Sequence, residues 1–372
     1  MESQRVERKE VKKMGKRTII PFGPQHPVLP EPVHLDLVIE DERVVEAIPS
    51  IGYIHRGLEK LVEKKEYTEM VYVIERICGI CSFGHGWGYC AAVEGAMDIK
   101  VPERAEYLRT IWHELGRMHS HLLWLGLLAD GFGFESLFMH CWRIRETVLD
   151  IFEETTGGRV IFSVCKVGGL RKDVDAKTLE KMSGLLNGIK KELQELTDVF
   201  LEDRSVKNRL CGVGVLSKEE AEELGAVGPM ARASGVAQDM RMAGHGKYLE
   251  LGFEPVVETD GDCYARCKVR LREVFQSIDL INKAIDEIPE GDIAVPVKGN
   301  VDGEFITRME QPRGEAIYYA KGQGTKFLER MRVRTPTNAN IPAMVKTLQG
   351  CDLADVPMLV LTIDPCISCT ER

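Results

Sequence analysis

Arg76-Ile77-Cys78-Gly79-Ile80-Cys81 and Asp364-Pro365-Cys366-Ile367-Ser368-Cys369 lie toward opposite ends of the 372-residue chain, and each carries a C-x-x-C pair. A C-x-x-C turn directs two sulfur atoms at one point, and two such turns can supply four thiolates to one soft metal. We therefore expect folding to bring the two ends of the chain together around a metal centre. On spacing alone, a structural zinc site with four cysteine ligands is the simpler interpretation.

The composition is that of a globular protein, with 44% hydrophobic and 29% charged residues. The length allows two or three domains and a large buried core. A formal net charge of -9 without a basic domain argues against nucleic acid as a partner. The 11 cysteines, in a chain with no evident secretion signal, are expected to be reduced thiols or metal ligands rather than disulfides.

The sequence contains no expected membrane-spanning segment. Its longest apolar stretch, residues 122–129, is far shorter than a bilayer crossing requires, and residues 1–17 have no signal-peptide core. We therefore expect a cytoplasmic chain that reaches a membrane only through other subunits.

The pattern of apolar residues predicts four regions. Residues 1–17 form a charged tail, and residues 18–55 form an N-terminal loop and β region in which Val33, Leu35, Leu37 and Ile39 alternate with polar residues, as in a β-hairpin. Residues 56–289 form a helical bundle that contains the first cysteine pair. Residues 290–372 form a mixed α/β region that contains the second pair. The expected class is therefore α+β, mainly α.

Three helices are expected within the bundle. Apolar residues recur three or four positions apart after Pro102, again over residues 175–203, and again over residues 263–288. Near the C-terminus, the apolar run at residues 358–363 is a candidate for a buried strand that delivers the second cysteine pair to the interior.

The residues around both cysteine pairs resemble the metal-binding signatures of the large subunit of nickel-iron hydrogenases. Residues 76–85 match R-x-C-G-x-C-x-x-x-H, and residues 364–372 match D-P-C-x-x-C-x-x-H/R. Other stretches resemble the related 49 kDa family of respiratory complex I, at residues 23–27, 52–61, 120–123, 233–241 and 311–315. From residue 18 to the end, the chain is identified as a member of the energy-converting, membrane-associated hydrogenase group.

The resemblance implies a specific ligand set. Cys78 and Cys366 would be terminal ligands of nickel, and Cys81 and Cys369 would bridge nickel to an iron that carries cyanide and carbon monoxide. Soft thiolates suit both metals. The complex I relative lacks all four cysteines, so a metal-free, quinone-interacting electron-transfer scaffold is the alternative function.

Further residues gain catalytic roles from the resemblance. Glu31 would relay a proton from a terminal thiolate, although a loop glutamate that faces water is the plain alternative. Arg313, which follows Pro312, would lie over the open side of the metals as a permanent cation, with Asp364 as its partner. The plain alternative for Arg313 is a surface arginine.

Other matched positions would support the centre. His85 would form a hydrogen bond with a bridging thiolate, or would be a core histidine, and Thr335 would bond a cyanide, or would sit in a turn. Glu59 matches a ligand of a structural magnesium ion. That site is in doubt, because Arg372 stands where a histidine ligand is expected and a guanidinium cannot coordinate a cation. We expect Glu59 to pair with arginine instead.

The implied activity is the interconversion of hydrogen with two protons and two electrons. Because the sequence offers no iron-sulfur cluster site of its own, electrons would pass through an iron-sulfur small subunit to a ferredoxin-like carrier. Membrane ion-translocating subunits would complete a complex on the cytoplasmic face of the cell membrane. Members of the family are processed three residues after the last metal-binding cysteine, so Arg372 corresponds to a mature end or to a variant made without an extension.

Overall fold

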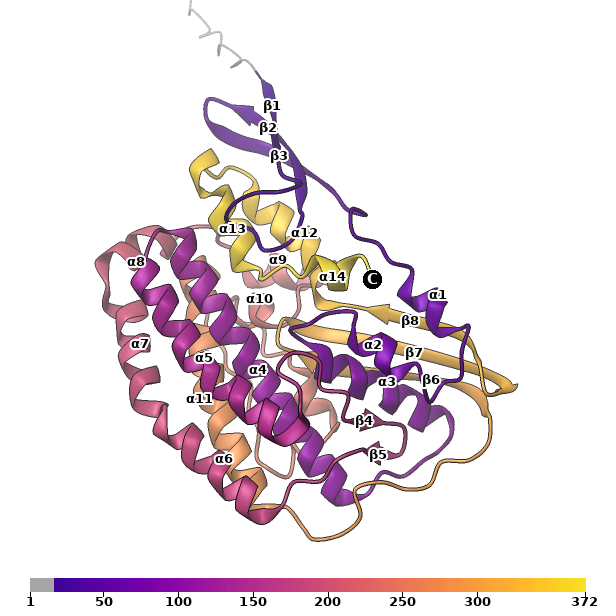
Figure 1. Ribbon diagram of the computed structural model, residues 1–372. Coiled ribbons are helices and arrows are strands. Elements are labelled where there is room, and N and C mark those ends of the chain that lie inside the picture. The colour runs from indigo at the N-terminus through magenta and orange to yellow at the C-terminus, as the bar shows by residue number, and fades with distance from the viewer. Residues whose placement is uncertain (1–16) are drawn as a thin grey trace, which may run out of the picture.

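The computed structural model describes residues 17–372, so nearly all of the expected charged tail lies outside the described residues. Figure 1 shows a layer of long helices beside one three-stranded sheet, with a second three-stranded sheet at the N-terminal end. The expected α+β, mainly helical class is confirmed. Within residues 17–372, no helix is both long enough and apolar enough to cross a bilayer.

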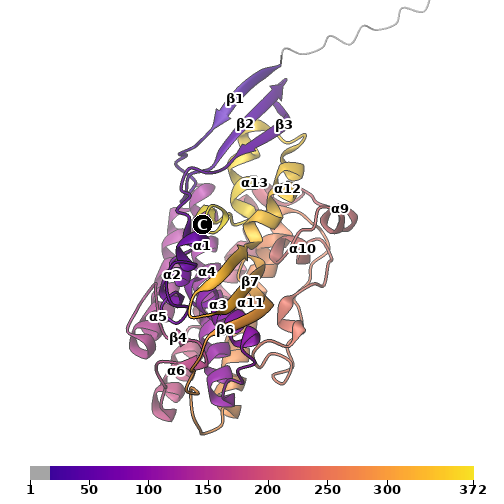
Figure 2. The same cartoon turned by 90° about the vertical axis from the view of Figure 1, so that its right-hand side faces the viewer.

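The N-terminal sheet has the order β1 (Thr18–Phe22), β2 (His34–Glu40) and β3 (Arg43–Ser50), all antiparallel. Its buried face contains Leu35, Leu37 and Ile39, as the alternation predicts. Figure 2 shows this sheet extending from one end of the molecule next to α12 (Pro336–Leu348) and α13 (Val356–Thr362). The amide of Gly350 donates to the Val44 carbonyl at 2.7 Å and thereby ties the sheet to the C-terminal region.

The helical layer is built on α4 (Glu103–Gly131), α5 (Glu135–Thr156) and α11 (Cys263–Glu287). Helix α4 begins after Pro102 as predicted, and Leu108, Leu115 and Leu122 of its apolar stripe are fully buried. Each of these leucines contributes about 1.5–3 kcal/mol by its burial. Helix α5 was not singled out from the sequence.

The predicted helix over residues 175–203 is divided in the structure. It consists of α6 (Ala176–Gly188) and α7 (Lys190–Glu202), which meet at Ile189. Glycine disfavours a continuous helix by roughly 1 kcal/mol relative to alanine, and Gly188 lies at this junction. The remaining α-helices are α1 (Leu58–Val62), α2 (Val71–Glu75), α3 (Ser82–Ala96), α8 (Arg204–Leu210), α9 (Lys218–Glu223), α10 (Pro229–Arg232) and α14 (Ile367–Thr370).

The C-terminal sheet consists of β6 (Val301–Gln311), β7 (Gly314–Thr325) and β8 (Leu328–Arg334), in antiparallel order. Helix α3 lies close against it, because Gly88 leaves room for the Tyr318 ring. A Cβ atom at Gly88 would come within 2.3 Å of that ring. The strands β4 (Cys165–Lys166) and β5 (Gly169–Leu170) form a small hairpin beside α3 and α4.

The strand expected at residues 358–363 is wrong, because this run lies in α13. A short apolar run fits a buried strand and a buried helix equally well when only periodicity is considered. Here Pro357 stands in the first turn, where a missing amide costs nothing. The run nevertheless delivers the second cysteine pair to the interior, with Cys366 directly before α14 and Cys369 within it.

Candidate metal centre

Four sulfur atoms from the two ends of the chain meet in one buried place. Cys78 and Cys81 lie in the turn between α2 and α3, while Cys366 and Cys369 lie at the start and within α14. The Sγ atom of Cys78 lies 3.3 Å from that of Cys366. The Sγ atom of Cys81 lies 3.6 Å from that of Cys369. Each contact joins one cysteine of the first pair to one of the second, and all four thiols are free and buried.

This donor set fits a soft metal group. The sulfur atoms of Cys78, Cys366 and Cys369 all lie within 4.8 Å of one another. Hydrogen bonds, that from Cys366 foremost, hold the pKa of Cys78 well below its usual value, and the charge of Arg313 acts in the same direction. A thiolate among closely spaced thiols suits a nickel-iron group, and the same donors also suit a zinc ion.

Arg313 reaches the site from the tip of a tight hairpin. Strands β6 and β7 pair Gln311 with Gly314, so Pro312 and Arg313 form a two-residue connection. The Arg313 guanidinium lies 2.7 Å from Asp364 Oδ1, and its Nε donates to the Asp364 carbonyl at 2.8 Å. The arginine is thus fixed in two directions beside the second cysteine pair.

Asp364 is held in an unusual conformation. Its backbone φ is 58°, in the left-handed region that non-glycine residues seldom adopt. Burial raises the pKa of this carboxyl in spite of the neighbouring Arg313. Its Oδ2 atom is buried and has no hydrogen-bond partner among the described residues. Strain and an unpaired oxygen at one position are typical of a functional site.

A cavity of about 280 Å³ adjoins the sulfur atoms. Its polar lining includes Glu31, Arg313 and Asp364, and its apolar lining includes Leu123, Trp124, Leu127 and Leu361. The Glu31 carboxylate accepts hydrogen bonds from the Ile367 amide, from the Ser368 amide at 3.3 Å and from the Ser368 hydroxyl. The structure therefore places Glu31 next to the Cys366 loop, while its proton-relay role stays a prediction.

His85 contacts a cysteine of the second pair, as the resemblance implies. Its Nε2 lies 3.2 Å from Cys369 Sγ, and its Nδ1 lies 2.8 Å from the Tyr318 hydroxyl. Burial lowers the pKa of His85 to about 4, so the ring is neutral at pH 7. Gln311 Nε2 donates to the Tyr318 hydroxyl at 2.9 Å, which leaves the hydroxyl proton for Nδ1. The Nε2 proton of His85 therefore points at the sulfur.

Sequence reasoning did not identify Tyr318 and Gln311 as members of the site. A signal was available for Tyr318, because the alternation of Ala316, Tyr318 and Ala320 places it on the buried face of a strand. Gln311 begins the stretch 311–315 that resembles the 49 kDa family, but its contact with Tyr318 depends on the hairpin register.

Thr335 and Pro312 also lie at the centre. The fully buried Thr335 hydroxyl donates to the Cys369 carbonyl at 3.1 Å and so supports the second cysteine loop. Its expected contact with a cyanide stays a prediction. Pro312 is buried and restricts the backbone immediately before Arg313.

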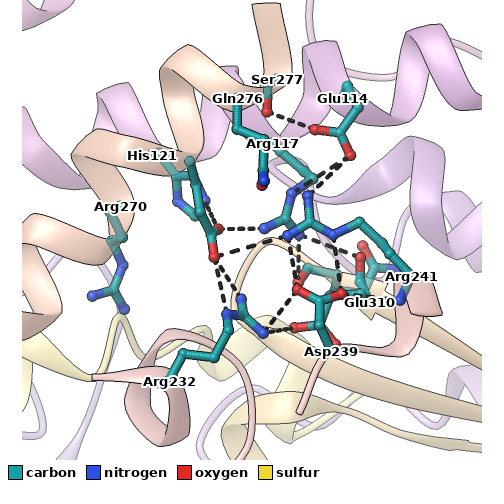
Figure 3. Close-up of polar contacts among 12 residues, drawn as sticks. Glu114, Arg117, His121, Arg232, Asp239, Arg241, Arg270, Gln276, Ser277 and Glu310 are labelled. Atoms are coloured by element: carbon teal, nitrogen blue, oxygen red, sulfur yellow. Dashed lines mark hydrogen bonds and ion pairs between the residues drawn. The ribbon is translucent and has the colours of Figure 1, made fainter. Parts of the chain in front are cut away.

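A buried charge network supports the hairpin from the far side (Figure 3). It joins side chains from α4, α10, the 3-10 helix η1 (Met240–Ala243) with its capping residue, α11 and β6, and consists of Glu114, Arg117, His121, Arg232, Asp239, Arg241, Glu273 and Glu310. Arg232 NH1 donates to Glu310 Oε1 at 2.7 Å, and Arg117 NH1 donates to the Gln311 carbonyl at 3.2 Å. The network therefore fixes the end of β6 from which Arg313 projects.

Glu59 does not offer a magnesium site in this chain. Its carboxylate accepts from Arg372 Nε at 2.9 Å, from Arg332 NH1 at 2.7 Å and from the Val333 amide at 2.8 Å. Among residues 17–372, Glu59 belongs to no group of three potential metal-ligating side chains. The expected pairing with arginine is confirmed, and the residues present do not fit a divalent cation.

Two protein families match the sequence. Residues 131–301 and 296–372 match the family described as respiratory-chain NADH dehydrogenase, 49 kDa subunit. Residues 56–129, which contain the first cysteine pair, match the family described as nickel-dependent hydrogenase.

Individual relatives cover nearly the whole chain. Membrane-bound hydrogenase subunit alpha of Pyrococcus furiosus is 40% identical, over 95% of this chain and 87% of the relative. The carbon monoxide-induced hydrogenase of Rhodospirillum rubrum is 38% identical, over 95% of this chain and 99% of the relative. Among solved structures, a chain of the archaeal membrane-bound sulfane sulfur reductase superposes with a TM-score of 0.90 at 30% identity, covering 98% of this chain and 100% of that chain.

Proposed function

Because this chain belongs to the family that unites the large subunits of membrane-associated nickel-iron hydrogenases with the 49 kDa subunit of respiratory-chain NADH dehydrogenase, we propose that it is the catalytic subunit of an energy-converting nickel-iron hydrogenase. It would interconvert hydrogen with two protons and two electrons.

The observation that carries this proposal is the pairing of sulfur atoms across the two ends of the chain. Cys78 lies against Cys366 and Cys81 lies against Cys369, at 3.3 and 3.6 Å. A scaffold that needs no metal has no evident use for four buried thiols at one point. The four cysteines would together hold nickel and iron, since thiolates are soft ligands that suit both metals. When bound, the metals supply the two-electron chemistry of hydrogen.

Arg313 provides a permanent positive charge beside the reacting space. Its guanidinium is buried, lines the cavity and is anchored by Asp364. In this poorly solvated environment, a fixed cation stabilises negative charge far more than it would in water.

Glu31 is proposed to move the proton. Its carboxylate lines the same cavity as Cys366 and is held by the backbone of the Cys366 loop. A proton held on the Cys366 sulfur would pass to a Glu31 carboxylate oxygen and then along the N-terminal loop, where His26 lines an adjoining cavity together with Glu31.

His85 is proposed to orient the Cys369 sulfur. Its neutral ring directs the Nε2 proton at Cys369, while Tyr318 and Gln311 hold the ring from the other side. Partners of this kind fix the direction and the basicity of a metal ligand.

The relatives suggest the partners. Their names describe subunits of membrane-bound enzymes, so we propose that this chain is a peripheral subunit of a membrane complex on its cytoplasmic face. An iron-sulfur small subunit would carry electrons to a ferredoxin-like acceptor, with membrane subunits that move ions.

Hydrogen-dependent reduction of a viologen dye by the purified complex, together with infrared spectroscopy, tests the proposal. We expect turnover and infrared bands from iron-bound cyanide and carbon monoxide. A complex that lacks both contradicts it.

A second candidate function is supported by the match to the NADH dehydrogenase 49 kDa subunit over residues 131–301 and 296–372. In that case the chain would be a metal-free, quinone-interacting scaffold, and reduction of quinone by a complex without nickel would favour it. Similarity to a chain of a sulfane sulfur reductase makes sulfane sulfur a further acceptor to assay in parallel.

A further inference from the structure

Residues 52–59 connect both cysteine loops and the last residues of the chain. Arg56 NH2 donates to the Ile77 carbonyl at 2.8 Å and to the Ser368 carbonyl at 3.2 Å. Ile77 directly precedes Cys78, and Ser368 directly precedes Cys369. One guanidinium therefore bridges the two loops that bring the sulfur atoms together.

Glu371 is hydrogen-bonded to the same segment, residues 52–59. The Glu371 carboxylate accepts from the Gly52 amide at 2.6 Å and from the Ile54 amide, and the Glu371 carbonyl lies 2.7 Å from His55 Nδ1. The residue is 5% exposed, so water competes little for these bonds. The second cysteine pair is thus tied down on its C-terminal side by backbone amides of the N-terminal region.

Arg372 adds a further contact with the segment of residues 52–59, because its side chain pairs with Glu59. Its side chain is 17% exposed, lies 2.9 Å from Glu59 Oε1 and donates from NH1 to the Thr370 carbonyl at 3.0 Å. Arg332 also pairs with Glu59, but it is 58% exposed and projects from β8. Burial acts to raise the pKa of Glu59, but the hydrogen bonds from the Val333 amide and the two guanidinium groups outweigh it, so the pKa is lowered.

We propose that Arg372 is a positioning residue whose guanidinium takes the place of a divalent cation at Glu59, and that this contact keeps the Cys366–Cys369 loop closed over its metals without magnesium. The identity of the metals in this proposal rests on the proposed function. The claim that Glu59 binds no divalent cation is independent of that function. The positive charge comes from the same segment that carries Cys366 and Cys369. When this segment takes its place beside the first cysteine pair, Arg372 therefore also pairs with Glu59.

The test compares Arg372→Gln with the matched control Arg332→Gln in the purified complex. The control removes the other guanidinium on the same carboxylate without touching the cysteine loop. The measurements are the nickel, iron and magnesium content and the rate at which EDTA removes nickel. We expect Arg372→Gln to lose nickel about tenfold faster than the parent protein, since a partly buried, charge-assisted bond is lost. Arg332→Gln should differ by less than about twofold, as expected of an exposed ion pair.

Two further variants separate the charge from a general loss of folding. Arg372→Lys keeps the charge and should return most of the nickel retention. Glu59→Gln combined with Arg372→Gln should lose nickel no faster than Arg372→Gln alone, because the two residues act through each other. Equal nickel loss in Arg372→Gln and Arg332→Gln, or no rescue by lysine, overturns the proposal.

Magnesium provides an independent result. The parent complex should contain no stoichiometric magnesium, and its thermal midpoint should be the same with magnesium chloride and with EDTA. Stoichiometric magnesium, or a thermal midpoint that EDTA lowers, overturns the claim that Arg372 takes the place of a divalent cation, whatever the other metals are. If the complex contains neither nickel nor iron, the proposed function fails, and the magnesium result still decides whether Arg372 replaces a divalent cation.

Discussion

His85 Nε2 lies 3.2 Å from Cys369 Sγ, so a neutral imidazole donates directly to one of the four converging sulfur atoms. The ring keeps this direction because the Tyr318 hydroxyl occupies its other nitrogen at 2.8 Å. Tyr318 of β7 thereby influences the Cys369 sulfur through His85, although Tyr318 makes no hydrogen bond with that sulfur itself.

Tyr318→Phe removes the hydroxyl and keeps the ring against Gly88. We expect a loss of hydrogen turnover of about tenfold with nickel content unchanged, because loss of a supporting partner typically costs about 10–100-fold. Dye-reduction rates and elemental analysis on the same preparation provide the measurement. Tyr319→Phe, on the other face of the same strand, is the control and should be silent. An unaltered rate in Tyr318→Phe would show that the His85 ring does not need the Tyr318 hydroxyl to keep its direction.

Cys366→Ser should abolish hydrogen turnover and reduce nickel content to background. Serine is a harder and far less acidic donor than cysteine, so the soft-metal ligand set is broken. Cys211→Ser changes an exposed thiol that belongs to neither cysteine pair and should behave like the parent protein. Retained turnover in Cys366→Ser refutes the assignment of the four cysteines.

Glu31→Gln should stop proton exchange while the metals stay in place. The amide keeps the size of the side chain but cannot accept and release a proton. The measurement is the formation of HD from deuterium gas in ordinary water, with nickel content determined in parallel. Glu46→Gln, on an exposed position of β3, is the control. Full exchange in Glu31→Gln rejects the relay and leaves the metal centre standing.

Arg313→Lys should lower turnover by about a hundredfold. Lysine keeps the charge but cannot hold both the Asp364 carboxylate and its carbonyl with one planar group. Arg308→Lys, which alters a half-exposed ion pair on the same hairpin, should change the rate by less than about twofold. Identical behaviour of the two variants would place Arg313 outside the reacting space.

Glu310→Gln tests the buried charge network through pH. Burial first, and then the charge of Asp239, raise the pKa of Glu310 to about 7, against about 4.3 in an unfolded chain. Between about pH 4.3 and pH 7, the folded protein therefore keeps a proton on Glu310 that the unfolded chain has released. The associated stability is complete below about pH 4.3 and is lost as the pH rises through about 7.

We expect the free energy of unfolding of the parent protein to fall by about 3 kcal/mol relative to Glu310→Gln between about pH 4.5 and pH 8. Urea titrations at a series of pH values provide the comparison. Glu304→Gln, on the exposed part of the same strand, serves as the control. Parallel profiles for the parent protein and Glu310→Gln would mean that Glu310 is ionised throughout.

The sequence predicted those parts of the molecule that depend on short-range patterns. The cysteine spacing predicted the convergence of the chain ends, and the 3.6-residue period after Pro102 predicted α4. The run at residues 358–363 was misassigned because a short, largely apolar run carries no period that separates a helix from a strand.

Other features depend on long-range contacts that no local pattern encodes. Tyr318 and Gln311 meet His85 only through the packing of α3 on β6 and β7. The buried charge network draws its members from several elements that are far apart in the sequence, and an isolated arginine or glutamate in the sequence gives no sign that it is buried.

Nickel X-ray absorption spectroscopy on the purified complex, with zinc quantified in the same sample, shows which metal the four cysteines bind. We expect one nickel per chain, bound by sulfur atoms and with iron as a near neighbour, and the loss of this signal in Cys366→Ser. A stoichiometric zinc ion with four sulfur ligands and no nickel would contradict it.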